Sequence, residues 1–146
     1  MIRQATHADI PRLVELGAMM HAESPAYSRL AFSPEKLATT LGVTVDRGFA
    51  QVVETDWRVI GGMFGLVVPH WFSDDLQACD LALFIEPQFR GGMAAVRLLR
   101  AYGEWAKESG AKQILFGITT GIDVETTQML CERLGWRRAG VVMEMT

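Results

Sequence analysis

An arginine and two glycines precede a long amphipathic helical pattern, and residues of these types at this spacing could bind an anion. An apolar segment at residues 81–85 ends before a proline, and the turn that follows carries Arg90, Gly91 and Gly92. One helical face then recurs at the i, i+3, i+4, i+7 spacing, through Ala95, Leu98, Leu99, Tyr102, Trp105 and Ala106. The free N–H groups of a helix N-terminus attract anions, and a guanidinium fits phosphate oxygens. The pattern predicts a phosphate site, with an ordinary strand–turn–helix unit as the alternative.

Two common phosphate-binding motifs are missing from this turn. No Gly-Lys-Ser/Thr follows, as a Walker loop requires, and the second and third glycines of the dinucleotide-binding GxGxxG pattern are missing. A nucleotide-binding protein that uses the same turn is therefore a disfavoured hypothesis, because the Walker lysine and the acidic metal ligands are lacking. The three histidines, His7, His21 and His70, have no metal-ligand spacing, so we expect no bound metal.

The segment at residues 85–95 reads IEPQFRGGMAA and resembles the acetyl-CoA-binding motif of the GNAT superfamily of N-acetyltransferases. In that family the motif follows the fourth strand and reads roughly V-x-P-x-x-R-G-x-G-x-G/A. Met93 stands at the middle glycine of the motif, and Gly92 lies one residue earlier. The positions that match directly are Arg90, Gly91 and Ala95.

A second segment, LCERLGW at residues 130–136, resembles the family's L-Y-x-K-x-G-F, and the element order and length agree over nearly the whole chain. The resemblance implies that acetyl-CoA (CoA) is the cofactor, with its diphosphate in the turn and its pantetheine arm along the fourth strand. The arm would satisfy backbone groups that splayed strands leave unpaired. The cofactor-binding residues implied in this way are Leu83, Phe84, Ile85, Gln88, Arg90, Gly91, Gly92, Met93, Ala94 and Ala95.

Acetyl transfer to an amine needs a base, an oxyanion donor and an acid for the leaving thiolate. The leading candidate for the base is Asp80, which shares one face of the fourth strand with Phe84; a solvent-exposed charge is the alternative. By resemblance, the oxyanion donor is the backbone N–H of Phe84 or Ile85. The acid of many family members is a tyrosine at the position of Cys131, whose thiol could donate but which is more simply a packing residue. Val124 replaces a frequent family asparagine.

The acceptor side of the family is lined by the segment between its first two helices. Here that segment contains His21, Glu23 and Tyr27, which could bind or deprotonate an amine, although a solvated loop is the more common explanation. No motif identifies the acceptor. A second loop, at residues 69–75, carries Trp71 and Phe72 as either a contact surface or core packing.

The elements that must position these residues follow from periodicity and turn residues. Strands are expected at residues 2–5, 49–54, 59–68, 76–85, 113–118, 136–139 and 141–145. Helices are expected from Ile10 to Met20, from Pro34 to near Gly42, from the glycine turn to Gly110, and at residues 123–134. We therefore expect an α/β (α+β) fold: one central mixed sheet of about seven strands flanked by about four helices, which is also the GNAT-like order.

Composition sets further bounds. At 146 residues and 49% apolar content, the chain is expected to form one domain, residues 1–146. A net charge of −3 argues against nucleic acid or anionic membrane as a partner, and the longest apolar run, residues 59–69, is too short to span a bilayer. Two cysteines without a signal peptide predict reduced thiols and a cytoplasmic location. The apolar C-terminal segments could pair across a homodimer.

The resemblance to the GNAT superfamily, with the arginine–glycine turn that opens a helix, implies an N-acetyltransferase that transfers an acetyl group from acetyl-CoA to a primary amine, of a small molecule or of a protein or peptide. The amine would attack directly in a ternary complex. The alternative is a non-catalytic acyl-CoA-binding or interaction module of the same fold, which the departures at Met93, Val124 and Cys131 favour.

Overall fold

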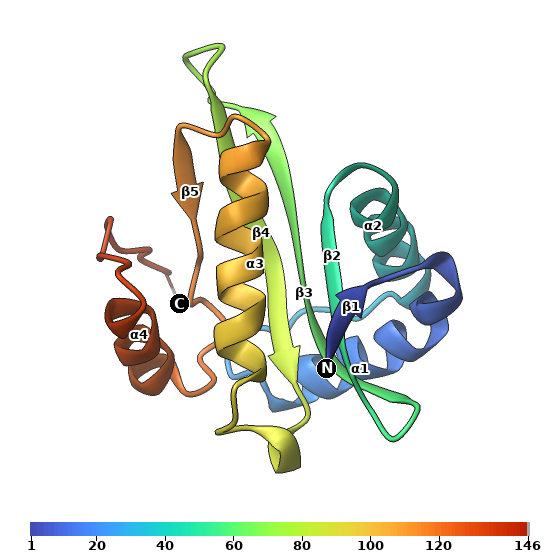
Figure 1. Cartoon of the computed structure of the whole chain (residues 1–146). Helices are drawn as coiled ribbons and strands as arrows, with labels where there is room; N and C mark the ends of the chain where they lie inside the picture. The colour runs from blue at the N-terminus through green and yellow to red at the C-terminus, as the bar shows by residue number, and fades with distance from the viewer. Residues whose placement is uncertain (146) are drawn as a thin grey trace.

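The structure, a computed structural model, describes residues 1–145 (Figure 1). The strands are β1 (Ile2–Gln4), β2 (Phe49–Thr55), β3 (Arg58–Pro69), β4 (Leu76–Ile85) and β5 (Gln113–Leu115). The helices are α1 (Ile10–Glu23), α2 (Pro34–Arg47), α3 (Ala94–Glu108) and α4 (Val124–Arg133). Short 3-10 turns, His7–Asp9 and Pro87–Phe89, lie before α1 and α3.

The strands form one mixed sheet in the order β1-β2-β3-β4-β5. Neighbours from β1 to β4 are antiparallel, and β4 and β5 run parallel, joined by a crossover through α3. The predicted mixed sheet with four flanking helices is confirmed, but within the described residues it has five strands rather than about seven.

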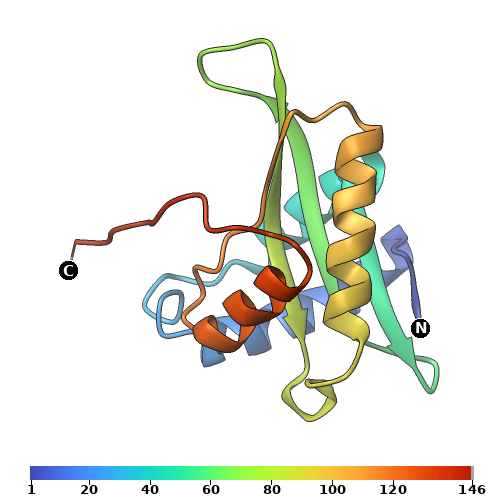
Figure 2. The ribbon, with the colours of Figure 1, turned by 60° about the vertical axis from the view of Figure 1, so that its left-hand side comes forward.

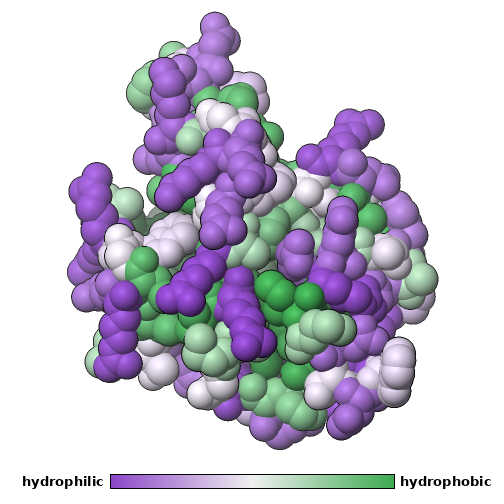
Figure 3. Space-filling model, viewed as in Figure 1, coloured by the Kyte–Doolittle hydropathy of each residue, from purple (hydrophilic) through white to green (hydrophobic). Residues whose placement is uncertain are grey.

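The two faces of the sheet are covered by different helices (Figures 1 and 2). On one face α3 buries Leu98, Leu99, Tyr102 and Ala106 against Met63 and its neighbours in the sheet. On the other face α1 and α2 pack their apolar residues, Leu13, Leu16 and Leu41 among them, against Val52 and Phe64. In Figure 3 polar side chains cover most of the upper part of the α3 face, whereas apolar surface shows beside the lower half of this helix.

Local interactions explain where two of the helices begin. The Asp9 carboxylate accepts the Thr6 N–H at 2.8 Å and two hydrogen bonds from the Arg3 guanidinium at 2.9 Å, which fixes the turn into α1. Arg3 also holds the pKa of Asp9 below its ordinary value. Ser33 Oγ accepts the Lys36 N–H at 3.2 Å and caps α2, as the Ser-Pro-Glu start predicts.

The predicted end of α2 near Gly42 is wrong, because the helix continues to Arg47. Leu41 and Thr44 are buried on its inner face, so tertiary packing outweighs the low helix propensity of a single glycine. The chain stops being helical at Gly48, where an added Cβ would lie 2.4 Å from the Gly65 carbonyl oxygen.

The two predicted strands at residues 136–139 and 141–145 are not formed. Trp136 stacks against Tyr102 with ring centroids 6.3 Å apart and contacts the Phe116 ring, which turns the chain away from the sheet. Beyond this point the apolar side chains are exposed, from 62% at Val141 to 95% at Met145. A short apolar segment becomes a strand only when a neighbouring strand pairs with it, and over residues 136–145 the structure shows no such pairing.

β4 and β5 pair along only three residues, which determines where a ligand could enter. The ladder joins Gln77, Ala78 and Cys79 to residues 113–115. β5 was predicted to continue to residue 118 but ends at Leu115. At the same level, Asp80 faces Gly65 while Ala82 faces Phe64, so Leu81 is an extra residue in β4. Such a bulge bends a strand, and the two strands separate from this point on.

None of the helices within residues 1–145 has both the length and the apolar character needed to cross a lipid bilayer.

Candidate functional site

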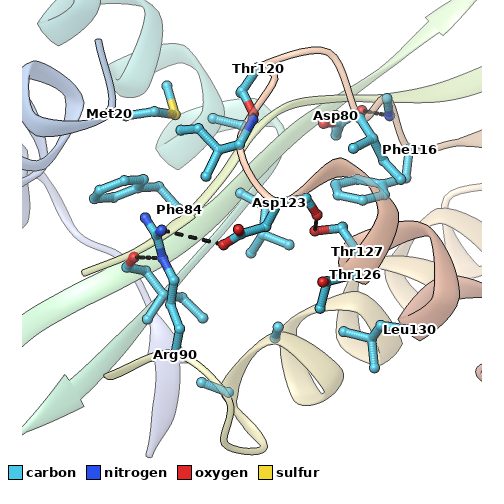
Figure 4. A pocket seen from close by; sticks show the side chains of 18 of the residues that line it. Met20, Asp80, Phe84, Arg90, Phe116, Thr120, Asp123, Thr126, Thr127 and Leu130 are labelled. Atoms are coloured by element: carbon cyan, nitrogen blue, oxygen red, sulfur yellow. Dashed lines mark hydrogen bonds and ion pairs between the residues drawn. The ribbon is translucent and has the colours of Figure 1, made fainter. Parts of the chain in front are cut away.

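A cavity of about 710 Å³ opens where β4 and β5 separate (Figure 4). Its walls are the free edge of β4, the turn before α3, the segment after β5 and the first turns of α4. Leu83, Phe84 and Ile85 of β4 line it. So do five of the predicted cofactor residues at the turn and the start of α3: Arg90, Gly91, Gly92, Ala94 and Ala95. Gln88 and Met93 do not. Eight of the ten residues predicted to bind the cofactor therefore lie in the wall of one cavity.

Ile85 presents its backbone groups to this cavity. The next residue, Glu86, donates its N–H to the Ile60 carbonyl of β3 at 2.9 Å. Successive residues of a strand direct their backbone groups to opposite sides, so the N–H of Ile85 points away from β3. The Ile85 carbonyl also faces that side, because it accepts a hydrogen bond from Arg90 Nε at 2.8 Å. Of the two predicted oxyanion donors, Ile85 rather than Phe84 has the required direction.

The N-terminus of α3 faces the same cavity with room beside it. The first hydrogen bond of the helix runs from Arg97 N to Met93 O at 3.0 Å, and the Met93 side chain caps no backbone group. The N–H groups of the first turn therefore remain available for an anion. Gly91 adopts a φ of 92°, and a Cβ added at Gly91 or Gly92 would meet no atom within 4 Å. The space beside these N–H groups is therefore open to a ligand.

Arg90 is not a free charge at the turn, contrary to the prediction that it simply faces phosphate. Its Nη1 and Nη2 each donate to the Glu23 carboxylate at 2.7 Å, which forms a bidentate pair between the turn and the end of α1. Asp123 Oδ2 lies 3.7 Å from Nη1, and the guanidinium carbon is 5.2 Å from the centre of the Phe84 ring (Figure 4). The hydrogen bonds that Arg90 donates to the Glu23 carboxylate raise the pKa of Arg90.

A buried carboxylate anchors the turn from the opposite side. Glu86 is only 2% exposed, and it pairs with Arg12 of α1 and with Arg58 of β3 at 3.4 Å. Gln88 Nε2 donates to Glu86 Oε2 at 2.8 Å, so its side chain is turned away from the predicted cofactor site. Met93 is 52% exposed and does not line the cavity either.

Replacing Glu86 by alanine is expected to lower the free energy of unfolding by roughly 2–3 kcal/mol, because it leaves two arginines and an amide without their shared acceptor. Urea denaturation of both proteins measures the difference. Glu104→Ala, at an exposed position of α3, is the control and should change stability by less than about 0.5 kcal/mol. Equal losses for the two variants would contradict a structural role for the Glu86 cluster.

Asp80 is the acidic residue at the point where the strands separate. Its Oδ1 accepts the Gly117 N–H at 2.7 Å, so the carboxylate bridges the opening between β4 and the segment after β5. It lines the cavity (Figure 4). Burial raises the pKa of Asp80 to about 6, and the Gly117 hydrogen bond opposes this rise. A carboxylate with a pKa in this range can accept a proton at neutral pH.

Cys131, the predicted acid, lies in the hydrophobic core rather than in the cavity wall. It is 7% exposed and belongs to the cluster around Leu98 and Tyr102. Burial raises the pKa of its thiol. The position of Cys131 therefore fits the packing role that the sequence analysis gave as the alternative to an acid. The hydroxyl of Tyr102 is also committed, since it donates to the Leu115 carbonyl at 2.7 Å.

The three predicted acceptor residues are placed differently. Tyr27 lines the cavity, with its hydroxyl 3.0 Å from Thr119 Oγ1. Glu23 does not line the cavity, but it accepts hydrogen bonds from Arg90, which does. His21 is turned away from it, because Nε2 lies 2.6 Å from the Leu30 carbonyl oxygen. Ser24, fully buried, binds the Thr120 carbonyl and so fastens this segment to the loop after β5.

Sequence reasoning missed the residues that α4 and the loop before it contribute. Asp123 adopts a φ of 45°, and Asp is among the few residues that tolerate this left-handed conformation. Its carboxylate faces Arg90, and the side chains of Thr126 and Thr127 lie beside it (Figure 4). Two threonine pairs, at residues 119–120 and 126–127, were the available signal. Among residues 1–145, His, Cys, Asp and Glu form no group that could hold a metal.

Solved structures share this fold. A predicted acetyltransferase from Clostridium acetobutylicum, solved with acetyl-CoA, matches at a TM-score of 0.75 and 15% identity over 100% of this chain and 95% of that chain. AAC(6')-Iy, in complex with the bisubstrate analog CoA-S-monomethyl-acetylneamine, matches at a TM-score of 0.77 and 14% identity over 100% of this chain and 96% of that chain. A transcriptional regulator from Bacillus halodurans matches at a TM-score of 0.76 and 18% identity over 100% of this chain and 98% of that chain. No model of a protein family and no curated protein sequence matches this chain. At these identities the likeness shows the fold, which is that of the GNAT-type acetyltransferases.

Proposed function

We propose that this protein is an N-acetyltransferase that transfers an acetyl group from acetyl-CoA to a primary amine. The observation that carries the proposal is the convergence of an unpaired strand edge and an uncapped helix N-terminus on one cavity. The Clostridium neighbour, solved with acetyl-CoA, and AAC(6')-Iy, solved with a CoA-containing analog, support this use of the fold.

Three parts of the cavity would hold the cofactor. The N–H groups from Gly91 to the first turn of α3 would bind the diphosphate, because they combine free donors with the positive end of the helix dipole. The backbone of Leu83, whose groups point to the same side as those of Ile85, would pair with the amides of the pantetheine arm. The acetyl-CoA thioester supplies the activated acyl group, which this arrangement would place near Asp80.

The chain's own groups would then move the proton and stabilise charge. Asp80, directly or through one water, would take the proton from the attacking amine. The Ile85 N–H would donate to the developing oxyanion. We assign no side chain as the acid for the departing thiolate, since Cys131 and Tyr102 face the core. Holding the two substrates together would supply much of the remaining rate.

Acetyl-CoA is expected to raise the melting temperature of the protein by about 5–10 °C when its concentration is a hundred times its Kd. Differential scanning fluorimetry with acetyl-CoA, longer acyl-CoAs and ATP measures this. ATP should give a much smaller shift, because it offers no amide-bearing arm to the β4 edge. No shift with millimolar acetyl-CoA, and none with longer acyl-CoAs, would overturn the cofactor assignment.

A non-catalytic acyl-CoA-binding module of the same fold is the second candidate. It is favoured by the core position of Cys131 and by the fold's occurrence in a protein described as a transcriptional regulator. Thiol release from acetyl-CoA across a panel of amines distinguishes the two functions. Release above the hydrolysis background with any amine would exclude the non-catalytic module, and binding without release would favour it.

A further inference from the structure

We propose that Glu23 is an internal competitor for Arg90, so that the diphosphate of CoA must take the guanidinium away from this carboxylate in order to bind fully. The inference rests on the proposed function, because it concerns how the same site admits its cofactor. It gives Glu23 a regulatory role at the diphosphate site rather than the acceptor-binding role predicted from sequence.

The geometry of the pair is that of a carboxylate occupying an anion site. Glu23 satisfies both outer nitrogens of Arg90 at 2.7 Å, the fork geometry that a phosphate group would otherwise use. Arg90 immediately precedes Gly91 and Gly92, so the guanidinium belongs to the turn that carries the open space at the helix N-terminus. The Glu23 carboxylate therefore already occupies the position on Arg90 that a phosphate group would take.

Arg90 can exchange partners without leaving the turn. Its Nε remains bound to the Ile85 carbonyl, and its plane lies near the Phe84 ring, so only the two outer nitrogens need to change acceptor. Glu23 would be left with water, which it can reach because its side chain is 33% exposed. Asp123 lies 3.7 Å from the same guanidinium and adds a second negative charge that opposes an incoming phosphate.

If Glu23 competes with CoA for Arg90, replacing it by glutamine should strengthen CoA binding. If Glu23 only supports the structure, the same substitution should weaken it. Glu23→Gln keeps the shape of the side chain but removes its charge, so Arg90 is released and the negative field at the turn is reduced. We expect CoA to bind about fivefold more tightly to this variant. The unliganded variant should have a slightly lower melting temperature, because it loses the ion pair between α1 and the turn. A purely structural Glu23 would weaken binding and stability together.

The test is a double-mutant cycle read by isothermal titration calorimetry with CoA. Its members are wild type, Glu23→Gln, Arg90→Ala and the double variant. Arg90→Ala should weaken CoA binding, and adding Glu23→Gln to it should then raise the affinity less than the same substitution does in wild type, since the contested guanidinium is gone and only the loss of a negative charge remains. Asp46→Asn is the charge control: Asp46 is an exposed acid of α2 that pairs with His7 and lies outside the cavity wall. It should leave CoA affinity within about twofold.

Each outcome decides a different claim. Unchanged or weaker binding by Glu23→Gln overturns the competition, as does an equal gain in the Asp46→Asn control or in the Arg90→Ala background. Absence of CoA binding by wild type and by Glu23→Gln overturns the proposed function itself. Binding that appears only in Glu23→Gln supports competition strong enough to exclude CoA from the wild-type site.

Discussion

Asp80→Asn is expected to lower kcat/KM for acetyl transfer about a hundredfold or more while leaving the Kd for CoA nearly unchanged. The substitution removes the proposed general base, and such a group typically accelerates a reaction about 10²–10⁴-fold. An asparagine oxygen can still accept the Gly117 N–H, so the opening between the strands should keep its shape. Steady-state kinetics with the best amine found in the panel and calorimetry with CoA measure the two quantities.

The pH dependence gives this prediction a sharper form. Because the pKa of Asp80 is raised to about 6, the base is protonated and inactive at lower pH, and kcat/KM should rise as pH increases through about 6. The Asp80→Asn variant should lack this limb and retain only the dependence that comes from ionisation of the acceptor amine. A limb near pH 6 that persists in the variant, or full activity of the variant, would assign the base to another group.

Stability should change in the opposite direction from activity. Burial favours protonated Asp80, so its contribution to folding is complete below its ordinary pKa of 3.8 and is lost as pH rises through about 6. Asparagine resembles the protonated form, and at pH 8 the variant should therefore be more stable than wild type by roughly 2 kcal/mol. The difference should vanish near pH 4. Urea denaturation at the two pH values measures it.

The strand–turn–helix unit at the centre of the site could be predicted because its signals are local. The helical spacing of Leu98, Leu99 and Tyr102 identified the buried face of α3, and the Pro-Gln-Phe-Arg-Gly-Gly sequence at residues 87–92 located the turn. The two C-terminal strands could not be predicted correctly in the same way. Residues 136–145 contain short apolar segments typical of strands, but a strand also requires a pairing partner, and these segments carry no information about the partner.

The electrostatic state of Arg90 was beyond the reach of sequence for a similar reason. Glu23 lies 67 residues away in the chain, and Asp123 reaches the guanidinium from the loop before α4. Nothing local to the glycine turn indicates that its arginine already has an anionic partner. Asp80, by contrast, could be named as a candidate from its position on the strand, and it does line the cavity, although its raised pKa depends on burial that only the fold reveals.

Gly61→Ala is expected to weaken CoA binding about tenfold and to lower the free energy of unfolding by roughly 2–3 kcal/mol. An added Cβ at Gly61 of β3 would lie 2.5 Å from the Phe84 carbonyl oxygen and 2.9 Å from the Ile85 Cα. Both are backbone atoms, so the clash cannot be relieved by rotating a side chain. β4 must shift at the residues whose free edge is proposed to bind the pantetheine arm.

Two other glycines separate a local clash from a general loss of stability. Gly48→Ala would place its Cβ 2.4 Å from the Gly65 carbonyl oxygen, a comparable clash at residues that do not line the cavity. It should therefore destabilise the fold without changing CoA affinity measured well below its melting temperature. Gly103→Ala in α3 meets no atom closer than Trp136 Cζ2 at 3.9 Å and should be neutral or stabilising by up to about 1 kcal/mol. If Gly61→Ala and Gly48→Ala weaken CoA binding equally, the β4 edge has no special part in holding the cofactor. If only Gly61→Ala does, close contact between β3 and β4 is what aligns that edge with the helix N-terminus.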